Sequence, residues 1–337
     1  MIRKAGVACV LGLLLLWPLS GRAEERGGAA CLTYRVETAK QRFALGEPVQ
    51  VRVSWRNLCG AALQIESWRG PLAGVAELGN GELDFGVFAI DGARRTRLRY
   101  QGMYVDSSRR AYLGIAAHGR LERSYVLNAW LLSFFTPVAR TYDLDRPGTY
   151  EITSTYQSSS SPGRKDVWVG KLPAPPVRVE VVTLPPEELA LVRRRLDGGE
   201  LVAASIVASH RDERAIAGLI RLAASKDRSK RAHAYMALAH MRTAASTDAL
   251  GRAVVAEPDP LYRAGGANLL GGTRNPAAIP HLRKLVQDVS SDGEVEHDGK
   301  RFKVLTVRKW AVAALARLGV QVKLPYELEI GRARPRP

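Results

Sequence analysis

The sequence has few cysteines, and it lacks the short motifs that mark the common enzyme classes. Only three of its 337 residues are cysteine, and no two form a Cys-x-x-Cys pair, which excludes a thioredoxin-like redox site and a cysteine zinc site. The chain also has no Gly-x-Ser-x-Gly, no His-Glu-x-x-His, no P-loop and no dinucleotide-binding glycine motif. We therefore expect a protein that is not an enzyme, with no catalytic residue, no metal ligand and no cofactor.

Long apolar runs are absent beyond the first 23 residues. Arg3 and Lys4 precede the apolar run 5–19, and Gly21-Arg22-Ala23 supplies the small residues of a cleavage site. This pattern predicts a signal peptide over residues 1–23. An uncleaved membrane anchor is the weaker alternative, because a helix needs about 20 apolar residues to span a bilayer. We expect an exported protein, periplasmic or extracellular, without a transmembrane segment after cleavage.

Acidic residues are outnumbered by basic ones. The formal net charge is +17, and it falls to +14 without the three basic residues of the signal peptide. A basic surface attracts anionic partners. Because an exported protein meets little nucleic acid, we expect an acidic protein partner or an anionic envelope polymer, and no nucleic acid. A basic surface that is merely solvated is the alternative.

Cysteine usage fits an oxidising compartment. Cys9 leaves with the signal peptide, so that Cys31 and Cys59 remain as an isolated pair. Such a pair in an exported protein predicts one disulfide bond. Closing a loop of this length stabilises a protein by about 3.5 kcal/mol if the gain is loop-closure entropy.

The N-terminal half shows the alternation typical of strands. Val49, Val51 and Val53 alternate with polar residues, residues 177–181 do the same, and 85–90 form a shorter apolar run. Turn-forming pairs of glycine, proline, asparagine or aspartate separate these runs. The pattern predicts an antiparallel β-sandwich over residues 24–184.

Two segments of this half are similar to bacterial immunoglobulin-like domains. Gly46-Glu-Pro-Val49 leads into a strand that Asn57 closes, and residues 142–150 resemble the Leu-x-x-Pro-Gly-x-Tyr corner of such sandwiches. The resemblance covers roughly residues 32–182. It implies a sandwich fold, and since its motifs specify turns, it implies no chemistry.

The C-terminal half repeats itself. Segments that begin at Arg231, Arg263 and Arg308 share small and aliphatic residues at helical spacing, 32 and 45 residues apart. A period near 30 predicts a short α-helical solenoid, here over residues 185–325, followed by a basic tail at 326–337. The chain as a whole is thus predicted to be multidomain, all-β followed by all-α. The expected helices are 186–209, then the pairs 213–224 with 229–241, 246–256 with 260–271, and 276–287 with 304–318.

The repeats resemble a known family. Residues 307–319 are similar to the second helix of a HEAT-like repeat of the short type found in phycobilin lyases, and residues 275–282 to the first helix. The resemblance implies a binding array. Some HEAT-like arrays, such as deoxyhypusine hydroxylase, bind iron through His-Glu pairs, but no histidine here is followed by glutamate. Gly265 and Gly266 depart from the pattern, so that the middle repeat is either loose or closely packed.

Residues on the second helices are candidates for binding. His233, Met236 and His240 share one helix stripe, and the repeats bring equivalent positions into register. An insert before the last helix contains Asp298-Gly299 between two strand-like runs, which predicts a hairpin. We expect the concave face and this hairpin to bind the partner, with an ordinary partly exposed face and a plain loop as the alternatives. The candidate residues are His233, Met236, His240, Asn268, Trp310, Arg317 and Arg301.

Two further sets of arginines are notable. Arg95, Arg97 and Arg99 alternate along one predicted strand and present their charges on one face, either to an anionic polymer or to solvent. The repeated Arg231, Arg263 and Arg308 are expected to form a structural ladder with acids such as Asp227 and Asp259, which precede the same helices.

The sequence therefore predicts an exported, non-catalytic binding protein, a scaffold or adaptor that uses the concave face of a HEAT-like solenoid. One alternative is an enzyme of unrecognised type with its site between the two domains. The other is an anionic envelope-polymer binding module that uses the arginine strand and exposed tryptophans such as Trp68.

Overall fold

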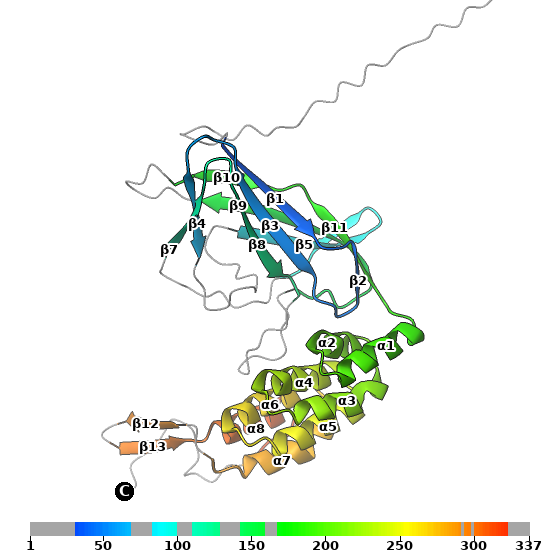
Figure 1. Ribbon diagram of the computed structural model, residues 1–337. Helices are drawn as coiled ribbons and strands as arrows, with labels where there is room; N and C mark the ends of the chain where they lie inside the picture. The colour runs from blue at the N-terminus through cyan, green and yellow to red at the C-terminus, as the bar shows by residue number, and fades with distance from the viewer. Residues whose placement is uncertain are drawn as a thin grey trace, which may run out of the picture.

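The computed structural model contains an N-terminal region of β-sheets and a C-terminal region of helices (Figure 1). It describes residues 31–68, 83–99, 110–128, 142–158, 167–290, 293–297 and 300–322. The predicted signal peptide (1–23) and basic tail (326–337) lie outside the described residues. The domain limits 24–184 and 185–325 stay predictions.

One sheet of the β region has three antiparallel strands in the order β1-β3-β8. These are β1 (Leu32–Thr38), β3 (Gln50–Asn57) and β8 (Arg120–Val126). In β3, Val51 and Val53 are buried while Arg52 is exposed, as the alternation predicted, because successive side chains of a strand point to opposite faces.

The second sheet follows the order β2-β11-β9-β5-β6, with β10 also paired to β9. Its pairs are antiparallel except for β2 with β11, which are parallel. A separate pair joins β4 to β7. The strands are β2 (Arg42–Ala44), β4 (Leu63–Trp68), β5 (Leu83–Asp91), β6 (Arg94–Arg97), β7 (Arg110–Ile115), β9 (Gly148–Ser158), β10 (Gly170–Pro173) and β11 (Val177–Val182).

Aromatic side chains join the two larger sheets into one core. The rings of Tyr34 (β1) and Trp55 (β3) lie 6.1 and 5.6 Å from the ring of Tyr156 (β9), and the Tyr34 hydroxyl lies 2.6 Å from Ser154 Oγ. Burying a large apolar side chain stabilises a fold by roughly 1.5–3 kcal/mol. Side chains that meet from both sheets therefore hold the sheets together.

Two polar residues close the ends of strands in the way that the sequence suggested. Asn57 is fully buried and donates its Nδ2 to the carbonyl oxygens of Ala61 (2.8 Å) and Ala116 (3.0 Å). The Tyr150 hydroxyl donates to the carbonyl oxygen of Arg146 at 2.7 Å, which fixes the turn into β9. These three bonds satisfy backbone carbonyls of residues that lie outside the strands.

The predicted disulfide between Cys31 and Cys59 is confirmed. The two Cα atoms lie 5.1 Å apart, within the range that a disulfide requires. The bond connects the residue before β1 with the turn after β3, and the backbone N–H of Leu58 donates to the carbonyl oxygen of Cys31 at 2.6 Å. It therefore ties together the ends of two paired strands.

The helical region contains four helix pairs instead of one long helix and three pairs. The predicted helix 186–209 is wrong in this respect, because it divides at Gly198-Gly199, where Gly199 has a φ of +84° that other residues rarely adopt. The first helices of the pairs are α1 (Pro186–Asp197), α3 (Ile216–Ala223), α5 (Ala244–Val255) and α7 (Ile279–Val286). Their second helices are α2 (Leu201–Ser209), α4 (Arg228–Met241), α6 (Pro260–Gly272) and α8 (Thr306–Arg317), and the short turns η2 (Glu213–Ala215) and η3 (Pro276–Ala278) precede α3 and α7.

Glycines bring the middle pair into close contact with its neighbours. A Cβ atom on Gly266 of α6 would overlap the side chain of Val254 on α5, and one on Gly271 would lie 2.8 Å from the Cα of Ala314 on α8. Of the two readings that Gly265 and Gly266 allowed, close packing is therefore the one observed. One apolar cluster runs from α1 to α8, and α2, α4, α6 and α8 contact one another in order.

The predicted hairpin lies before α8. Its strands are β12 (Gly293–His297) and β13 (Lys300–Val304), which pair with each other in antiparallel register (Figure 1). Only the backbone of these strands is described, so the side chain of Arg301 lies outside the described part of the chain, as does that of Trp68.

The β region contacts the first helix pair. Gly46, in the turn after β2, has a φ of +86°, and a Cβ atom there would lie 2.5 Å from the carbonyl oxygen of Ser205 on α2. Farther along, the N–H of Leu184 donates to Nε2 of His210 at 2.9 Å. Both contacts hold the connection between the regions. Within the described residues, no helix combines the length and apolar character that crossing a membrane demands.

Candidate functional site

The predicted binding residues other than Arg301 lie on α4, α6 and α8, the second helices of three successive pairs (Figure 1). Two of these helices, α4 and α6, begin at an aspartate cap. Asp227 caps α4 by accepting from the N–H of Ser229 at 2.8 Å, and Asp259 caps α6 by accepting from the N–H of Leu261 at 3.0 Å. The caps set the helical register, and with it the face on which each candidate lies.

Two of the candidates are in the core and do not form part of an exposed stripe. Met236 is 4% exposed and belongs to the apolar cluster, and Asn268 is fully buried. The stripe is covered at these two positions, because α4 and α6 each have a neighbouring helix on both sides. A stripe that faces solvent in an isolated helix is covered when the helix lies inside a stack.

The other described candidates remain at the surface. His233, His240 and Trp310 are half-buried, and His233 Nδ1 lies 2.9 Å from the carbonyl oxygen of Ser229. Two candidates are in direct contact: Arg317 on α8 donates to Oδ1 of Asn268 on α6 at 2.6 Å. Partial burial lowers the pKa of the Arg317 guanidinium, so this cation is incompletely solvated.

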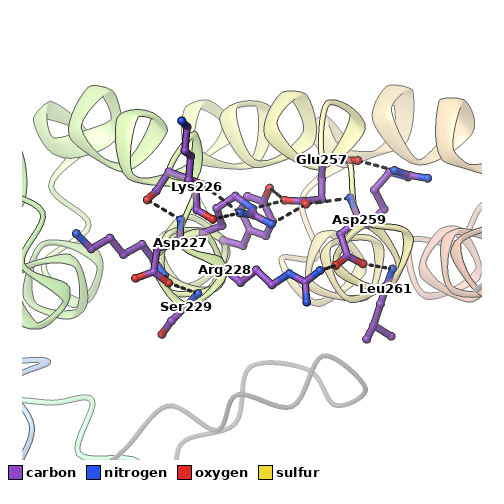
Figure 2. Close-up of polar contacts among 12 residues, drawn as sticks. Lys226, Asp227, Arg228, Ser229, Glu257, Asp259 and Leu261 are labelled. Carbon is purple, nitrogen blue, oxygen red and sulfur yellow. Dashed lines mark hydrogen bonds and ion pairs between the residues drawn. The ribbon is translucent and has the colours of Figure 1, made fainter.

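The repeated arginines form a ladder, but with other acids than predicted. In the Arg231–Glu257 contact, Nε of Arg231 donates to Oε2 at 2.8 Å, and Nη2 donates to Oε1 at 3.1 Å (Figure 2). Glu257 is buried and also accepts from the Tyr235 hydroxyl at 2.6 Å. Burial and the hydrogen bond to Glu257 raise the pKa of Tyr235, and the hydrogen bond to Glu257 raises that of Arg231.

The next arginine of the ladder, Arg263, repeats this arrangement one helix pair farther along. Arg263 donates its Nε to Oδ2 of Asp288 at 2.8 Å and its Nη2 to Ser290 Oγ at 2.7 Å. Burial acts to raise the pKa of Asp288, but the bonds from Ser290 and Arg263 hold it below its usual value. Each arginine thus reaches an acid that lies two residues after the first helix of the following pair.

The third arginine, Arg308, pairs with no such acid among the residues that the structure describes. Arg308 is 7% exposed, and its Nε has no hydrogen-bond partner. Asp227 and Asp259, the acids that the sequence suggested for the ladder, are occupied in capping, and Asp259 also pairs with Arg228 at 3.1 Å. Sequence reasoning selected acids near the arginine along the chain, whereas the true partners are 25 or 26 residues away.

The arginine strand of the β region is largely neutralised. In β6, Arg95 pairs with Glu151 at 2.9 Å and lies 3.5 Å from the centre of the Phe88 ring. Arg97 lies 3.7 Å from Asp84, while Arg99 is exposed. Because two of these three charges have a carboxylate close by, the strand is a weaker attractant for anions than its sequence suggests.

One further cluster of polar side chains has no signal in the sequence. His281 on α7 is mostly buried, and its Nε2 lies 2.8 Å from Oδ1 of Asp248 on α5, which also pairs with Arg252. The bond to His281 lowers the pKa of Asp248. Gly251 makes room for the imidazole, since a Cβ atom there would overlap the ring. No group of three or more metal-ligating side chains occurs within the described ranges.

Comparison with known proteins identifies the repeats. Residues 216–297 match the family model for HEAT repeats, which confirms the HEAT-like character predicted for this part of the chain. No curated protein matches the sequence.

Similar solved structures include the β-glucosidase of Listeria innocua in complex with gluconolactone, with 13% identity over 45% of this chain and a TM-score of 0.23. The Bacillus subtilis sporulation control protein Spo0M has 10% identity over 49% of this chain and 56% of its own, with a TM-score of 0.22. Escherichia coli α2-macroglobulin has 13% identity over 87% of this chain and 19% of its own, with a TM-score of 0.22. This chain spans only 17% of the β-glucosidase, and TM-scores this low carry no argument about fold or function.

Proposed function

We propose that this protein is an exported, non-catalytic scaffold or adaptor, and that its partner binds on the concave face of a short HEAT-like solenoid. The observation that carries the proposal is the match to HEAT repeats together with the ordered contacts of α2, α4, α6 and α8. Stacked repeats create an extended surface to which every repeat contributes a similar row of side chains, and such surfaces serve in binding.

The N-terminal region is proposed to be an immunoglobulin-like β-sandwich. The support is the contact of Tyr34 and Trp55 with Tyr156 across two sheets, and the Tyr150 hydroxyl that bonds back to the carbonyl oxygen of Arg146. A tyrosine that bonds to the backbone a few residues upstream is typical of the corner in such sandwiches. In this proposal the sandwich positions the solenoid through the contact of Gly46 with α2.

The binding surface is proposed to consist of the candidates that remain at the surface. His233 and His240 lie two turns apart on α4, and Trp310 and Arg317 have the same spacing on α8. An acidic protein partner would complement this surface, because Arg317 is partly desolvated and its described polar contacts are with Asn268 and the Ala313 carbonyl, so no carboxylate there neutralises it. A half-buried tryptophan two helical turns from a cation provides the apolar anchor that interface hot spots require.

Affinity capture from the native envelope tests this function. We expect the double variant Trp310→Ala/Arg317→Gln to capture the partner at least tenfold more weakly than the unmodified chain, since each hot-spot truncation costs about 2 kcal/mol or more. The matched control is Leu191→Ala/Arg283→Gln, which changes an exposed apolar residue of α1 and an exposed cation of α7.

The control variant should capture the partner normally. Equal capture by both variants at an unchanged thermal midpoint would place the binding surface elsewhere. A large loss of midpoint in the first variant would mean that Trp310 acts in the core, and the variant Arg317→Gln alone would then decide.

A further inference from the structure

Three arginines occupy equivalent left-handed positions at the ends of successive second helices. Arg211 follows α2 with a φ of +51°, Arg242 follows α4 with +57°, and Arg274 follows α6 with +53°. The same position after α8 holds Gly319, with a φ of +78°. Along the chain the arginines are 31 and 32 residues apart, which is the period of the repeats.

The three positions lie along one edge of the helix stack. Helices α2, α4 and α6 contact one another in order, and every repeat has the same sense, so their C-terminal ends point to the same side. Nδ2 of Asn275 donates to the carbonyl oxygen of Arg242 at 3.3 Å, which joins two neighbouring loops directly. Packed helices are about 10 Å apart, so one arginine follows the next at about that distance.

The fold itself gives no reason for arginine at these positions. A left-handed backbone strains every residue with a Cβ atom, and glycine or asparagine adopts it most readily. At the fourth equivalent position the chain has glycine, which adopts this backbone without strain. At the other three positions the strained residue is in each case an arginine.

All three arginine side chains are exposed, and none has an ion pair or hydrogen bond within the described residues. Other arginines of the same helices are paired, such as Arg231 with Glu257. The carboxylate beside the first position, Asp212, is held by Arg193 at 2.5 Å, and Glu213 is the only other acid in the three loops. The row therefore carries three charges that the described protein does not neutralise.

We propose that this arginine ridge, formed by Arg211, Arg242 and Arg274, binds an anionic polysaccharide. The guanidinium group binds a carboxylate through two parallel hydrogen bonds, and three such groups about 10 Å apart fit acidic groups spaced along an extended polymer. The loops 210–214, 241–244 and 273–276 contain no Trp, Tyr or Phe on which nucleotide bases would stack. Helix-connecting loops also offer no strand edge or apolar groove for a peptide.

The ridge is distinct from the proposed protein-binding surface. Its residues Arg211, Arg242 and Arg274 follow their helices, whereas His233 and Trp310 lie within α4 and α8 and Arg317 is the last residue of α8. The inference does not rest on the proposed function, and the variant Trp310→Ala/Arg317→Gln is expected to bind polysaccharide normally. Failure of one proposal can therefore be told from failure of the other.

Binding of the full chain to polygalacturonate, measured by calorimetry at low salt, tests the ridge. The triple variant Arg211→Gly/Arg242→Gly/Arg274→Gly should bind about tenfold more weakly, because each exposed arginine–carboxylate contact contributes roughly a twofold gain in affinity. Its thermal midpoint should not fall, since glycine relieves the left-handed strain. The matched control Arg194→Gln/Arg283→Gln/Lys309→Gln removes three exposed charges elsewhere and should bind within about twofold of the unmodified chain.

The triple asparagine variant at the same three positions provides a second route, because asparagine also tolerates this backbone. An equal loss with asparagine and glycine supports the proposal, even if one of the two variants folds poorly. An equal loss in the matched control would overturn it in favour of general charge attraction, and equal binding to neutral dextran would overturn it as well. Tighter binding to duplex DNA, also lost in the ridge variants, would reassign the ridge to nucleic acid.

Discussion

Replacing Arg231 by methionine should destabilise the protein much more than the same change at Arg308. Both arginines are buried at equivalent positions of their repeats, at 9% and 7% exposure. Arg231 is bonded to Glu257 at 2.8 and 3.1 Å, and that carboxylate is completely buried. Within the described part of the chain, Arg308 pairs with no acid, and its Nε has no hydrogen-bond partner. The variants Arg231→Met and Arg308→Met therefore make the same change of side chain. Only the first leaves a buried carboxylate without its partner.

The expected magnitudes follow from what each variant leaves unpaired. Removing one partner of a buried ion pair costs about 3–5 kcal/mol, because the remaining charge is desolvated without compensation. In Arg231→Met the remaining charge is Glu257, which keeps only the Tyr235 hydroxyl and the N–H of Asp259 as donors. A chain of this size loses about 2–4 °C of thermal midpoint per kcal/mol, so we expect a fall on the order of 10 °C. Arg308→Met should change the stability by less than about 1 kcal/mol, since it removes an unsatisfied donor.

Urea denaturation and thermal scanning of the two variants provide the measurement. The double variant Arg231→Met/Glu257→Met should recover much of the loss, because an apolar pair can replace a buried ion pair at little cost. Equal losses at Arg231 and Arg308 would refute the reasoning, since packing of the stem would then dominate. Strictly additive losses in the double variant would show that Arg231 and Glu257 are not coupled.

Three other predictions concern separate contacts. The denatured, unreduced mature protein should contain no free thiol, and Cys31→Ser/Cys59→Ser should lower stability by about 3.5 kcal/mol, whereas two titratable thiols would contradict the bond. Gly46→Ala should lower the free energy of unfolding by about 1–3 kcal/mol, because alanine is strained in this left-handed backbone, and it should accelerate proteolysis between the two regions. Unchanged cleavage would show that this turn does not hold the two regions together. Because the folded pKa of Asp248 is lowered first by the bond to His281, its stabilisation is present above the unfolded pKa and is lost as pH falls through the folded one. Thermal midpoints of Asp248→Asn and the unmodified chain should therefore differ at neutral pH and converge in acid, and a constant difference would exclude the linkage.

Much of the local structure was readable from the sequence because it depends on residues close together in the chain. The alternation at Val51 and Val53 predicted β3, and the arginine-aligned repeats predicted α4, α6 and α8 to within three residues at their ends. Asp298-Gly299 between two short runs predicted the hairpin β12–β13. The disulfide followed from the count of cysteines.

The candidate site was less predictable, because burial and pairing depend on distant segments. Met236 shares a stripe with His233 and His240, but the neighbouring helices cover it. Asn268 is likewise enclosed, and the candidate residue that it contacts, Arg317, lies 49 residues away along the chain. A helical stripe fixes which side chains share a face, but only the stack decides whether that face meets solvent.

The sequence by itself determined the order of the two regions, the repeat period and the bonded cysteines, since these follow from periodicity and composition. Tertiary structure alone decided which acid pairs with Arg231 and which with Arg263, because Glu257 and Asp288 reach these arginines only when successive helix pairs stack. It also decided that Arg211, Arg242 and Arg274 adopt left-handed backbone in a row. A backbone angle and a contact across repeats are properties of the folded chain, and the spacing of residue types does not encode them locally.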